Sequence, residues 1–217
     1  MKNSLLDRYV AAQVEGDRRA ALRIVLEDGP RSGVSVPDLY LGVIQAAQHR
    51  IGDLWQMNRI SVSHEHLATA ISQLAIAHLY PLMPRHASVE RRVLVSCVDG
   101  ELHDLGARMV ADFFEMYGFD TRYLGASMPA ESLVATVRED VPDLLVLSAT
   151  MSTNLPALRA TVAGIRDAVG DRIKLGVGGS AFHSAHGEAS ALGADVHGRD
   201  ALESVVDACR VLAVATR

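Results

Sequence analysis

Apolar residues recur at three- and four-residue intervals over residues 5–83. This spacing puts them on one face of an amphipathic helix. The pattern is interrupted at Gly16, at 29–33 and at 57–61, so it predicts four successive helices. Because the connections are short, we expect these helices to form a small antiparallel bundle over residues 1–84.

A different pattern begins after a polar segment at 85–91, which we interpret as a linker. Short, nearly continuous apolar runs now alternate with helical stretches, as expected for an α/β domain with a parallel sheet over residues 92–217. Ligands of such domains bind at the carboxyl ends of the strands, so we look for function in the strand-to-helix loops. The predicted strands lie at 92–98, 121–125, 143–150, 173–179 and 194–198.

The composition narrows the function classes. Hydrophobic residues make up 49% and charged residues 22% of the 217 residues, which is typical of a globular protein. The formal net charge of −5 argues against direct binding of nucleic acid, which needs clustered Lys and Arg. Cys97 and Cys209 are far apart and form no CxxC pair, so we interpret them as buried thiols. With neither a signal peptide nor a membrane span in the pattern, we expect a cytoplasmic protein.

The loop after the first predicted strand carries the densest candidate chemistry. Residues 98–106 contain three acids, one histidine and two glycines at the sheet edge where ligands bind. A polar turn that caps the next helix would explain the same residues. The loop lacks the GxGxxG motif that a dinucleotide site needs, and the glycines of 176–180 come only with a later strand. The sequence therefore argues against a dinucleotide site.

Three short motifs, in order along the chain, favour a ligand site over a polar turn. Residues 101–106 read Glu-Leu-His-Asp-Leu-Gly, Ser148 lies in the third predicted strand, and Gly178-Gly179 follow the fourth. Together they resemble the (D/E)xHxxG, SxL and GG signature of cobalamin-binding domains, which have a Rossmann-like (flavodoxin-like) fold. The third strand departs from SxL, since Thr150 stands where that family often has leucine.

The resemblance implies that His103 coordinates the cobalt of cobalamin after the cofactor's own dimethylbenzimidazole is displaced. A ligating imidazole needs its other nitrogen held by an acceptor. Glu101 and Asp104 are both candidates for that acceptor.

The remaining motif residues would hold the displaced nucleotide tail. Leu105 and Gly106 open the helix that follows the loop, and Gly106, with Gly178 and Gly179, would let the tail pass close to the backbone. Ser148 and Thr150 would form hydrogen bonds to the displaced base.

The helical half contains a second motif. Trp55 is followed after nine residues by Glu65-His66. A core tryptophan and a polar helix start would explain these residues locally. The spacing also resembles the Wx9EH motif of light-sensing, adenosylcobalamin-dependent repressors of the CarH type, whose four-helix cap covers the upper face of the corrin. By that resemblance the three residues would surround the adenosyl group.

This second resemblance makes a stand-alone adenosylcobalamin photoreceptor the leading functional hypothesis, with biliverdin or another bilin as a second chromophore. The repressors have a winged-helix DNA-binding domain with no counterpart in this pattern, so we expect output through a homo-oligomer or a protein partner. We expect the chain not to be an enzyme; if it is enzymatic, it would be a corrinoid methyl-transfer component. One alternative is therefore a corrinoid carrier of a methyltransferase system, holding methylcobalamin. Another is an α/β interaction domain without cobalamin. His183, His186 and His197 are less specific candidates near the ligand edge.

Overall fold

The computed structural model describes residues 4–184 and 188–214 and divides the chain into two compact units, Met1–Pro84 and Arg85–Arg217. The first unit is helical and the second is α/β with a parallel sheet, which confirms the predicted fold class. Within the described ranges, no helix combines the length and the apolar character that crossing a membrane requires.

The helical unit has four helical stretches, as the apolar spacing predicts. Two of them contain a wider π-helical turn, Ile24–Asp28 and Tyr40–Gln45, between their α-helical parts. Ser61 caps the last stretch by accepting a hydrogen bond from the His64 backbone N–H. The α-helices are α1 (Leu5–Val14), α2 (Arg18–Arg23), α3 (Gly29–Arg31), α4 (Val36–Leu39), α5 (Ala46–Gln56) and α6 (Val62–Leu79).

A buried polar cluster joins three of these helices. Ser72 of α6 accepts hydrogen bonds from Gln13 of α1 and Gln48 of α5, each at 2.8 Å, and its hydroxyl lies 3.1 Å from that of Tyr9. The surrounding core is aliphatic and aromatic, so these bonds specify how α1, α5 and α6 pack.

The α/β unit alternates strands with helices along the chain. Its strands are β1 (Arg92–Cys97), β2 (Asp120–Tyr123), β3 (Leu144–Ser148) and β4 (Lys174–Gly178). Its helices are α7 (Leu105–Met116), α8 (Ala130–Glu139), α9 (Leu155–Val169), α10 (Ala181–Ser184), α11 (Glu188–Ala191) and α12 (Ala201–Val211).

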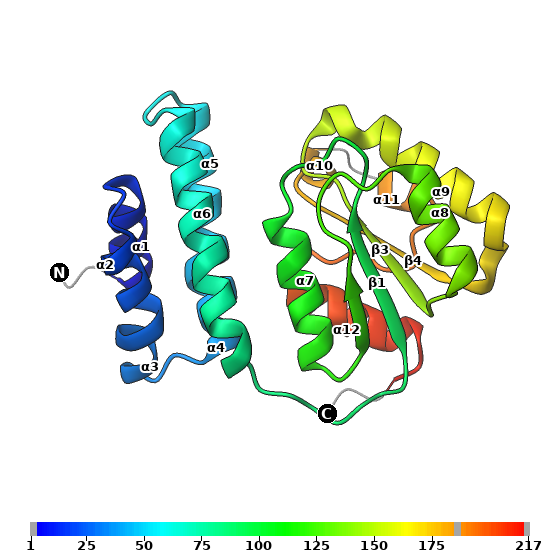
Figure 1. Ribbon diagram of the computed structural model, residues 1–217, viewed down its shortest axis with the longest axis horizontal. Helices are drawn as coiled ribbons and strands as arrows, with labels where there is room; N and C mark the ends of the chain where they lie inside the picture. The colour runs from blue at the N-terminus through cyan, green and yellow to red at the C-terminus, as the bar shows by residue number, and fades with distance from the viewer. Residues whose placement is uncertain (1–3, 185–187, 215–217) are drawn as a thin grey trace. The chain divides into compact units, whose positions relative to one another are not determined.

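The four strands are all parallel, in the order β2-β1-β3-β4. Helices α7 and α12 cover one face of the sheet, and α8 and α9 cover the other (Figure 1). Leu94, Leu145 and Leu175 join side chains of α8 and α9 in one buried apolar cluster. In this order β2 lies on one side of β1, and β3 and β4 lie on the other. The switch point of the sheet is therefore between β1 and β3, and the loops after these two strands lie next to each other at the carboxyl edge.

The fifth predicted strand, 194–198, was wrong. Within the described residues this segment forms an isolated bridge between Val196 and Gly176. The segment between the glycines at 193 and 198 is very short. Within it, the side chain of Asp195 accepts a hydrogen bond from the backbone N–H of Leu175 at 2.9 Å. A side-chain carboxylate thus replaces the backbone carbonyl that a strand would offer there.

Candidate functional site

The loop after β1 is tied to the loop after β2. Gly100 has a positive φ of 77°, which turns the chain sharply, and its N–H donates to the Ser127 hydroxyl at 3.1 Å. The Ser127 N–H in turn donates to the carbonyl of Glu101 at 2.9 Å. These bonds fix the backbone on which Glu101 and His103 stand.

Glu101 is completely buried, although it lies in a loop. One carboxylate oxygen, Oε1, accepts the backbone N–H of His103 at 2.9 Å and lies 2.6 Å from Nδ1 of the His103 ring. The other, Oε2, accepts the backbone N–H groups of Thr150 at 2.7 Å and Met151 at 3.0 Å, and the Asn154 amide at 2.9 Å. The carboxylate therefore joins the loops after β1 and β3.

These donors decide the charge of Glu101. Burial raises the pKa of the carboxyl, but the hydrogen bonds from His103, Met151 and Asn154 outweigh it and lower the pKa to about 2. Glu101 is therefore an anion at neutral pH, and the buried charge is satisfied by donors on both oxygens.

His103 presents its ring from this anchor. The side chain is 52% exposed, whereas its partner Glu101 is buried. An ionised carboxylate at Nδ1 favours the tautomer with the proton on Nδ1, so the lone pair lies on Nε2. A ring held in this way fits a single axial metal ligand. Among the described residues, no group of three or more His, Cys, Asp or Glu could hold a metal ion.

Asp104, the other acidic candidate, contacts a different partner. Its Oδ2 accepts a hydrogen bond from the Tyr123 hydroxyl at 3.1 Å. Burial, followed by the nearby charge of Asp104, raises the pKa of Tyr123, so the phenol stays protonated and donates. Of the two acids, Glu101 is therefore the one that contacts Nδ1 of the His103 ring.

Leu105 and Gly106 begin α7 directly after this loop. Leu105 is buried and anchors the helix start, and Gly106 is exposed. A Cβ added at Gly106 would meet no atom of the described residues within 4 Å. The glycine therefore leaves the helix backbone open to a molecule that approaches it closely.

The two glycines after β4 differ. A Cβ at Gly178 would also meet no described atom within 4 Å. Gly179 has a φ of 107°, and a Cβ there would lie 2.2 Å from the Ala149 carbonyl oxygen. Gly179 is thus required by the packing of the neighbouring loop, whereas Gly178 leaves space that a ligand could use.

Ser148 and Thr150 flank the end of β3. Ser148 is buried and forms a hydrogen bond with the Cys97 thiol. Burial chiefly, with the charges of Asp104 and Glu101, raises the pKa of Cys97 to about 12, so this thiol is protonated. Thr150 contributes its backbone N–H to Glu101, and its carbonyl accepts the Ser180 hydroxyl at 3.1 Å. Both residues therefore lie at the carboxyl edge of the sheet, in or beside the Glu101 network.

Trp55, Glu65 and His66 lie in the helical unit, the first near the end of α5 and the others near the start of α6. The Trp55 residue is 40% exposed. Glu65 bonds within its own helix: Oε1 accepts the Thr69 hydroxyl at 2.9 Å, and Oε2 lies 2.5 Å from Nδ1 of His66. These bonds give Glu65 a local structural role.

The less specific histidines differ in how far they can be placed. Nδ1 of His197 lies 3.2 Å from the Val177 carbonyl, and its ring packs against Phe182. Contacts within the protein thus account for His197. His186 and the side chain of His183 lie outside the described residues.

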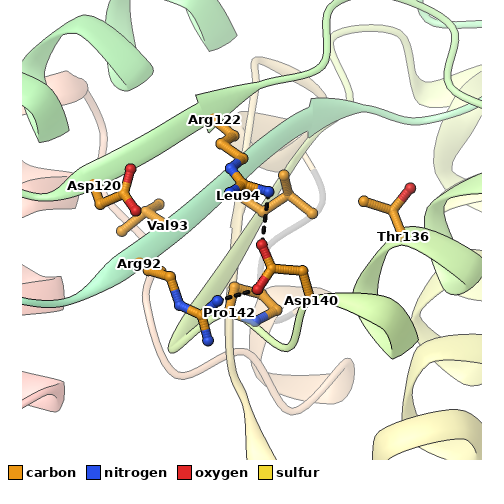
Figure 2. A pocket seen from close by; sticks show the side chains of 8 residues that line it. All are labelled: Arg92, Val93, Leu94, Asp120, Arg122, Thr136, Asp140 and Pro142. Atoms are coloured by element: carbon orange, nitrogen blue, oxygen red, sulfur yellow. Dashed lines mark hydrogen bonds and ion pairs between the residues drawn. The ribbon is translucent and has the colours of Figure 1, made fainter.

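A cavity at the other edge of the sheet does not compete with this site. Arg92, the first residue of β1, and Arg122 of β2 both pair with Asp140, the latter at 2.6 Å (Figure 2). Here two arginines share one carboxylate where the strands begin, away from the edge at which this fold binds ligands.

Sequence reasoning missed three partners of the site: Asn154, the backbone of Met151, and Tyr123. Asn154 directly precedes α9, where asparagine is an ordinary helix cap. Tyr123 ends β2, where an aromatic residue is an ordinary strand residue. A search for polar residues on all loops at the carboxyl edge would have found Asn154, since it follows β3 as His103 follows β1.

The structure places one oriented imidazole, that of His103, at the switch point of a parallel sheet, where proteins of this architecture bind ligands. The chain belongs to the B12-binding domain family, whose model matches residues 91–206. A second B12-binding domain model matches residues 5–80, so both units are covered.

Known relatives agree with this assignment. Dimethylamine corrinoid protein 1 of Methanosarcina acetivorans is 26% identical over 215 residues, which is 98% of this chain and 99% of the relative. The structure of the monomethylamine corrinoid protein of Methanosarcina barkeri covers 95% of this chain and 98% of its own, with a TM-score of 0.84 and 20% identity. A cobalamin-binding protein of Desulfitobacterium hafniense has a TM-score of 0.52 at 22% identity, with coverage of 95% and 98%.

These relatives correct the functional hypothesis. They are corrinoid proteins, not light sensors, so the prediction of a photoreceptor was wrong, and adenosylcobalamin and a bilin find no support. The error came from the Trp55 motif. Glu65 bonds to Thr69 and His66 within its own helix, whereas Trp55 lies on a different helix and is 40% exposed, so the spacing of the motif does not by itself point to an adenosyl group.

Proposed function

We propose that this chain is a corrinoid carrier of a methyltransferase system, with His103 as the lower ligand of cobalt. The observation that carries the proposal is the pair formed by the buried, ionised Glu101 and the half-exposed His103 ring at the carboxyl edge. The relatives named as dimethylamine corrinoid proteins favour carriage of methyl groups, and methylated amines are the first methyl sources to test.

Bound cobalamin would supply a cobalt centre that accepts a methyl group from one partner and gives it to another. The residues of this chain would hold and orient that centre. Glu101 keeps the proton of His103 on Nδ1 and fixes the ring, so Nε2 would face the cobalt. Ionisation of Glu101 also stabilises positive charge on the imidazole, which would increase its strength as a ligand.

The other predicted cofactor residues keep proposed roles. Gly106 and Gly178 would border the path of the nucleotide tail, since each leaves open space beside the backbone. Ser148 and Thr150 would bind the displaced base. Trp55, Glu65 and His66 remain proposed cofactor-binding residues of the helical unit. A methyltransferase that delivers or receives the methyl group would be the partner, and we keep a homo-oligomer as a proposal.

Reconstitution with hydroxocobalamin, followed by reduction to the Co(II) state, tests the lower ligand. Protein labelled with 15N-histidine should show splitting of the electron paramagnetic resonance signal by a protein nitrogen. His103→Ala should abolish that splitting. The matched control is His197→Ala, because His197 is also near the ligand edge but is held by Val177 and Phe182. A wild-type splitting in His103→Ala would refute the assignment.

Cofactor preference and methyl transfer test the carrier role. We expect the chain to retain methylcobalamin at least as well as adenosylcobalamin. We also expect Trp55→Ala to change the affinities for adenosylcobalamin and methylcobalamin by the same factor, because a carrier needs no contact specific to the adenosyl group. The reduced, cobalamin-loaded chain should gain a methyl group when a methylamine methyltransferase and mono-, di- or trimethylamine are added, seen as a change in its absorption spectrum. Exclusive binding of adenosylcobalamin together with no methylation from any donor would contradict the proposal.

A further inference from the structure

Ser127 lies on the loop after β2, and its backbone has a conformation that serine rarely adopts. Its φ is 47°, in the left-handed region where glycine is the usual residue. A residue with a side chain stays in this region only where the surrounding structure holds it there, and such strain gathers at functional sites. The contacts of Ser127 show what holds it.

Two hydrogen bonds join Ser127 to the loop after β1. Its hydroxyl accepts the N–H of Gly100 at 3.1 Å, and its own N–H donates to the carbonyl of Glu101 at 2.9 Å. The same loop contains a tight turn, because the Glu101 N–H donates to the Val98 carbonyl at 3.0 Å. Such a turn uses the N–H of its fourth residue. The N–H of its third residue, Gly100, takes its acceptor from Ser127.

Glu101 is thus held from both strands that neighbour β1. Its carboxylate accepts hydrogen bonds from the loop after β3, whereas its carbonyl accepts one from the loop after β2. The first set fixes the far end of the side chain, and Ser127 fixes the peptide from which the side chain starts. Leu102 alone separates this peptide from His103, so a shift of the peptide moves the imidazole with it.

We propose that Ser127 is a positioning residue for the lower cobalt ligand, because it fixes the turn from which Glu101 and His103 extend. The inference rests on the proposed function, since it presupposes that His103 binds cobalt. It extends that function by adding the loop after β2 to the determinants of ligation, outside the Glu-x-His motif. Ser127 itself would not touch the cobalt.

Two substitutions move stability and ligation in opposite directions. Ser127→Gly removes the hydroxyl, but glycine adopts a positive φ freely, and exposed Gly100 can donate to water instead. Its urea midpoint should therefore stay close to that of the wild type. Ser127→Thr keeps the hydroxyl but places a β-branched side chain at a positive φ, so its urea midpoint should fall. The positioning role predicts impaired ligation in Ser127→Gly and retained ligation in Ser127→Thr, and the reverse pattern would contradict it.

The spectroscopic test uses the full chain, labelled with 15N-histidine, loaded with hydroxocobalamin and reduced to Co(II). We expect the wild type and Ser127→Thr to show splitting by a protein nitrogen. In Ser127→Gly the equilibrium constant for ligation should fall roughly tenfold, the low end of the effects of residues that orient metal ligands. Ala126→Gly is the matched control, because it adds a glycine at an exposed position of the same loop and removes no hydroxyl.

A double-mutant cycle shows whether Ser127 acts through His103. Calorimetric titration with hydroxocobalamin gives the affinities of the wild type, Ser127→Gly, His103→Ala and the double variant. The roughly tenfold loss caused by Ser127→Gly should vanish when residue 103 is alanine, because no ligand is left to position. An equal loss in both backgrounds would overturn the inference, since Ser127 would then act on another part of the site.

The outcomes separate this inference from the proposed function. If Ser127→Gly retains wild-type splitting and cobalamin affinity, Ser127 is not a positioning residue, while His103 can still be the ligand. If the wild type shows no protein-nitrogen splitting, or His103→Ala matches it, the proposed ligand itself is wrong. If Ser127→Gly does not fold, Ser127→Ala, which also lacks the hydroxyl, decides alone, and its wild-type splitting would refute the inference.

Discussion

Oε1 of Glu101 lies 2.6 Å from Nδ1 of His103, and the carboxylate that makes this contact is completely buried beside a half-exposed ring. The buried partner carries the negative charge, and the exposed partner carries Nε2, the atom proposed to coordinate cobalt. This division lets the protein hold a fixed imidazole at its surface without exposing the group that orients it.

The first prediction concerns Glu101→Gln. A carboxamide has nearly the same shape, but its NH2 group would face either His103 or the backbone donors of Thr150 and Met151. A buried donor would then lack an acceptor, so the free energy of unfolding of the apo protein should fall by about 1–3 kcal/mol. Urea unfolding measures this change. The control, Glu139→Gln at an exposed position of α8, should change it little. Equal unfolding curves for Glu101→Gln and wild type would contradict the prediction.

The second prediction concerns pH and Asp195. Burial raises the pKa of this carboxyl, but the Leu175 N–H and the Lys174 ammonium outweigh it and hold the pKa below 3.8. Because the folded state binds the proton more weakly than the unfolded chain, Asp195 stabilises the fold above pH 3.8, and this contribution is lost as pH falls through the lowered pKa.

Asp195→Asn should therefore destabilise the α/β unit near neutral pH by about 1.5–3 kcal/mol, the scale of hydrogen bonds to a charged group. The difference from wild type should shrink as the pH is lowered below 3.8. Urea unfolding at several pH values checks both statements. A gap that stays constant from neutral to acidic pH would show that the charge of Asp195 does not contribute.

Strands β1, β3 and β4 could be predicted because their central residues are buried on both faces of the sheet. Val93, Leu94 and Val95 are all buried, which gives a continuous apolar run that short sequence windows detect. The segment around Val196 looks similar in sequence but pairs at one position. What separates the two cases is a side-chain bond from Asp195, and periodicity carries no information on such a bond.

The site was predictable in part for a similar reason. His103 and Glu101 are two residues apart, so one motif contains both of them. Asn154 is 53 positions from Glu101, and its contact depends on the order of strands in the sheet. The Trp55 motif misled the functional prediction. Trp55 and Glu65 lie on two different helices, and their spacing along the sequence does not identify the molecule that they contact.

The third prediction uses Gly106 to separate stability from binding. Gly106→Ala adds a methyl group in open space on α7, so helix propensity should raise the free energy of unfolding by about 0.5–1 kcal/mol. If the nucleotide tail of cobalamin passes here, the same methyl group should weaken cobalamin binding. Gly42→Ala in the helical unit is the control, since its added Cβ also meets no described atom within 4 Å. Unchanged cobalamin affinity in Gly106→Ala would place the tail elsewhere.

The last prediction divides the Gly178-Gly179 pair. Alanine at Gly179 would bring Cβ to 2.2 Å from the Ala149 carbonyl oxygen at a φ of 107°, so this variant should lose at least ~1–3 kcal/mol of stability. Alanine at Gly178 meets open space, and its stability should stay within about 0.5 kcal/mol of wild type. Because the cofactor tail is proposed to use that space, Gly178→Ala should nevertheless bind hydroxocobalamin more weakly. Urea unfolding and calorimetric titration measure the two quantities separately. A Gly179→Ala variant as stable as wild type would contradict the packing role of Gly179. A Gly178→Ala variant with full affinity would contradict the proposed cofactor role of Gly178.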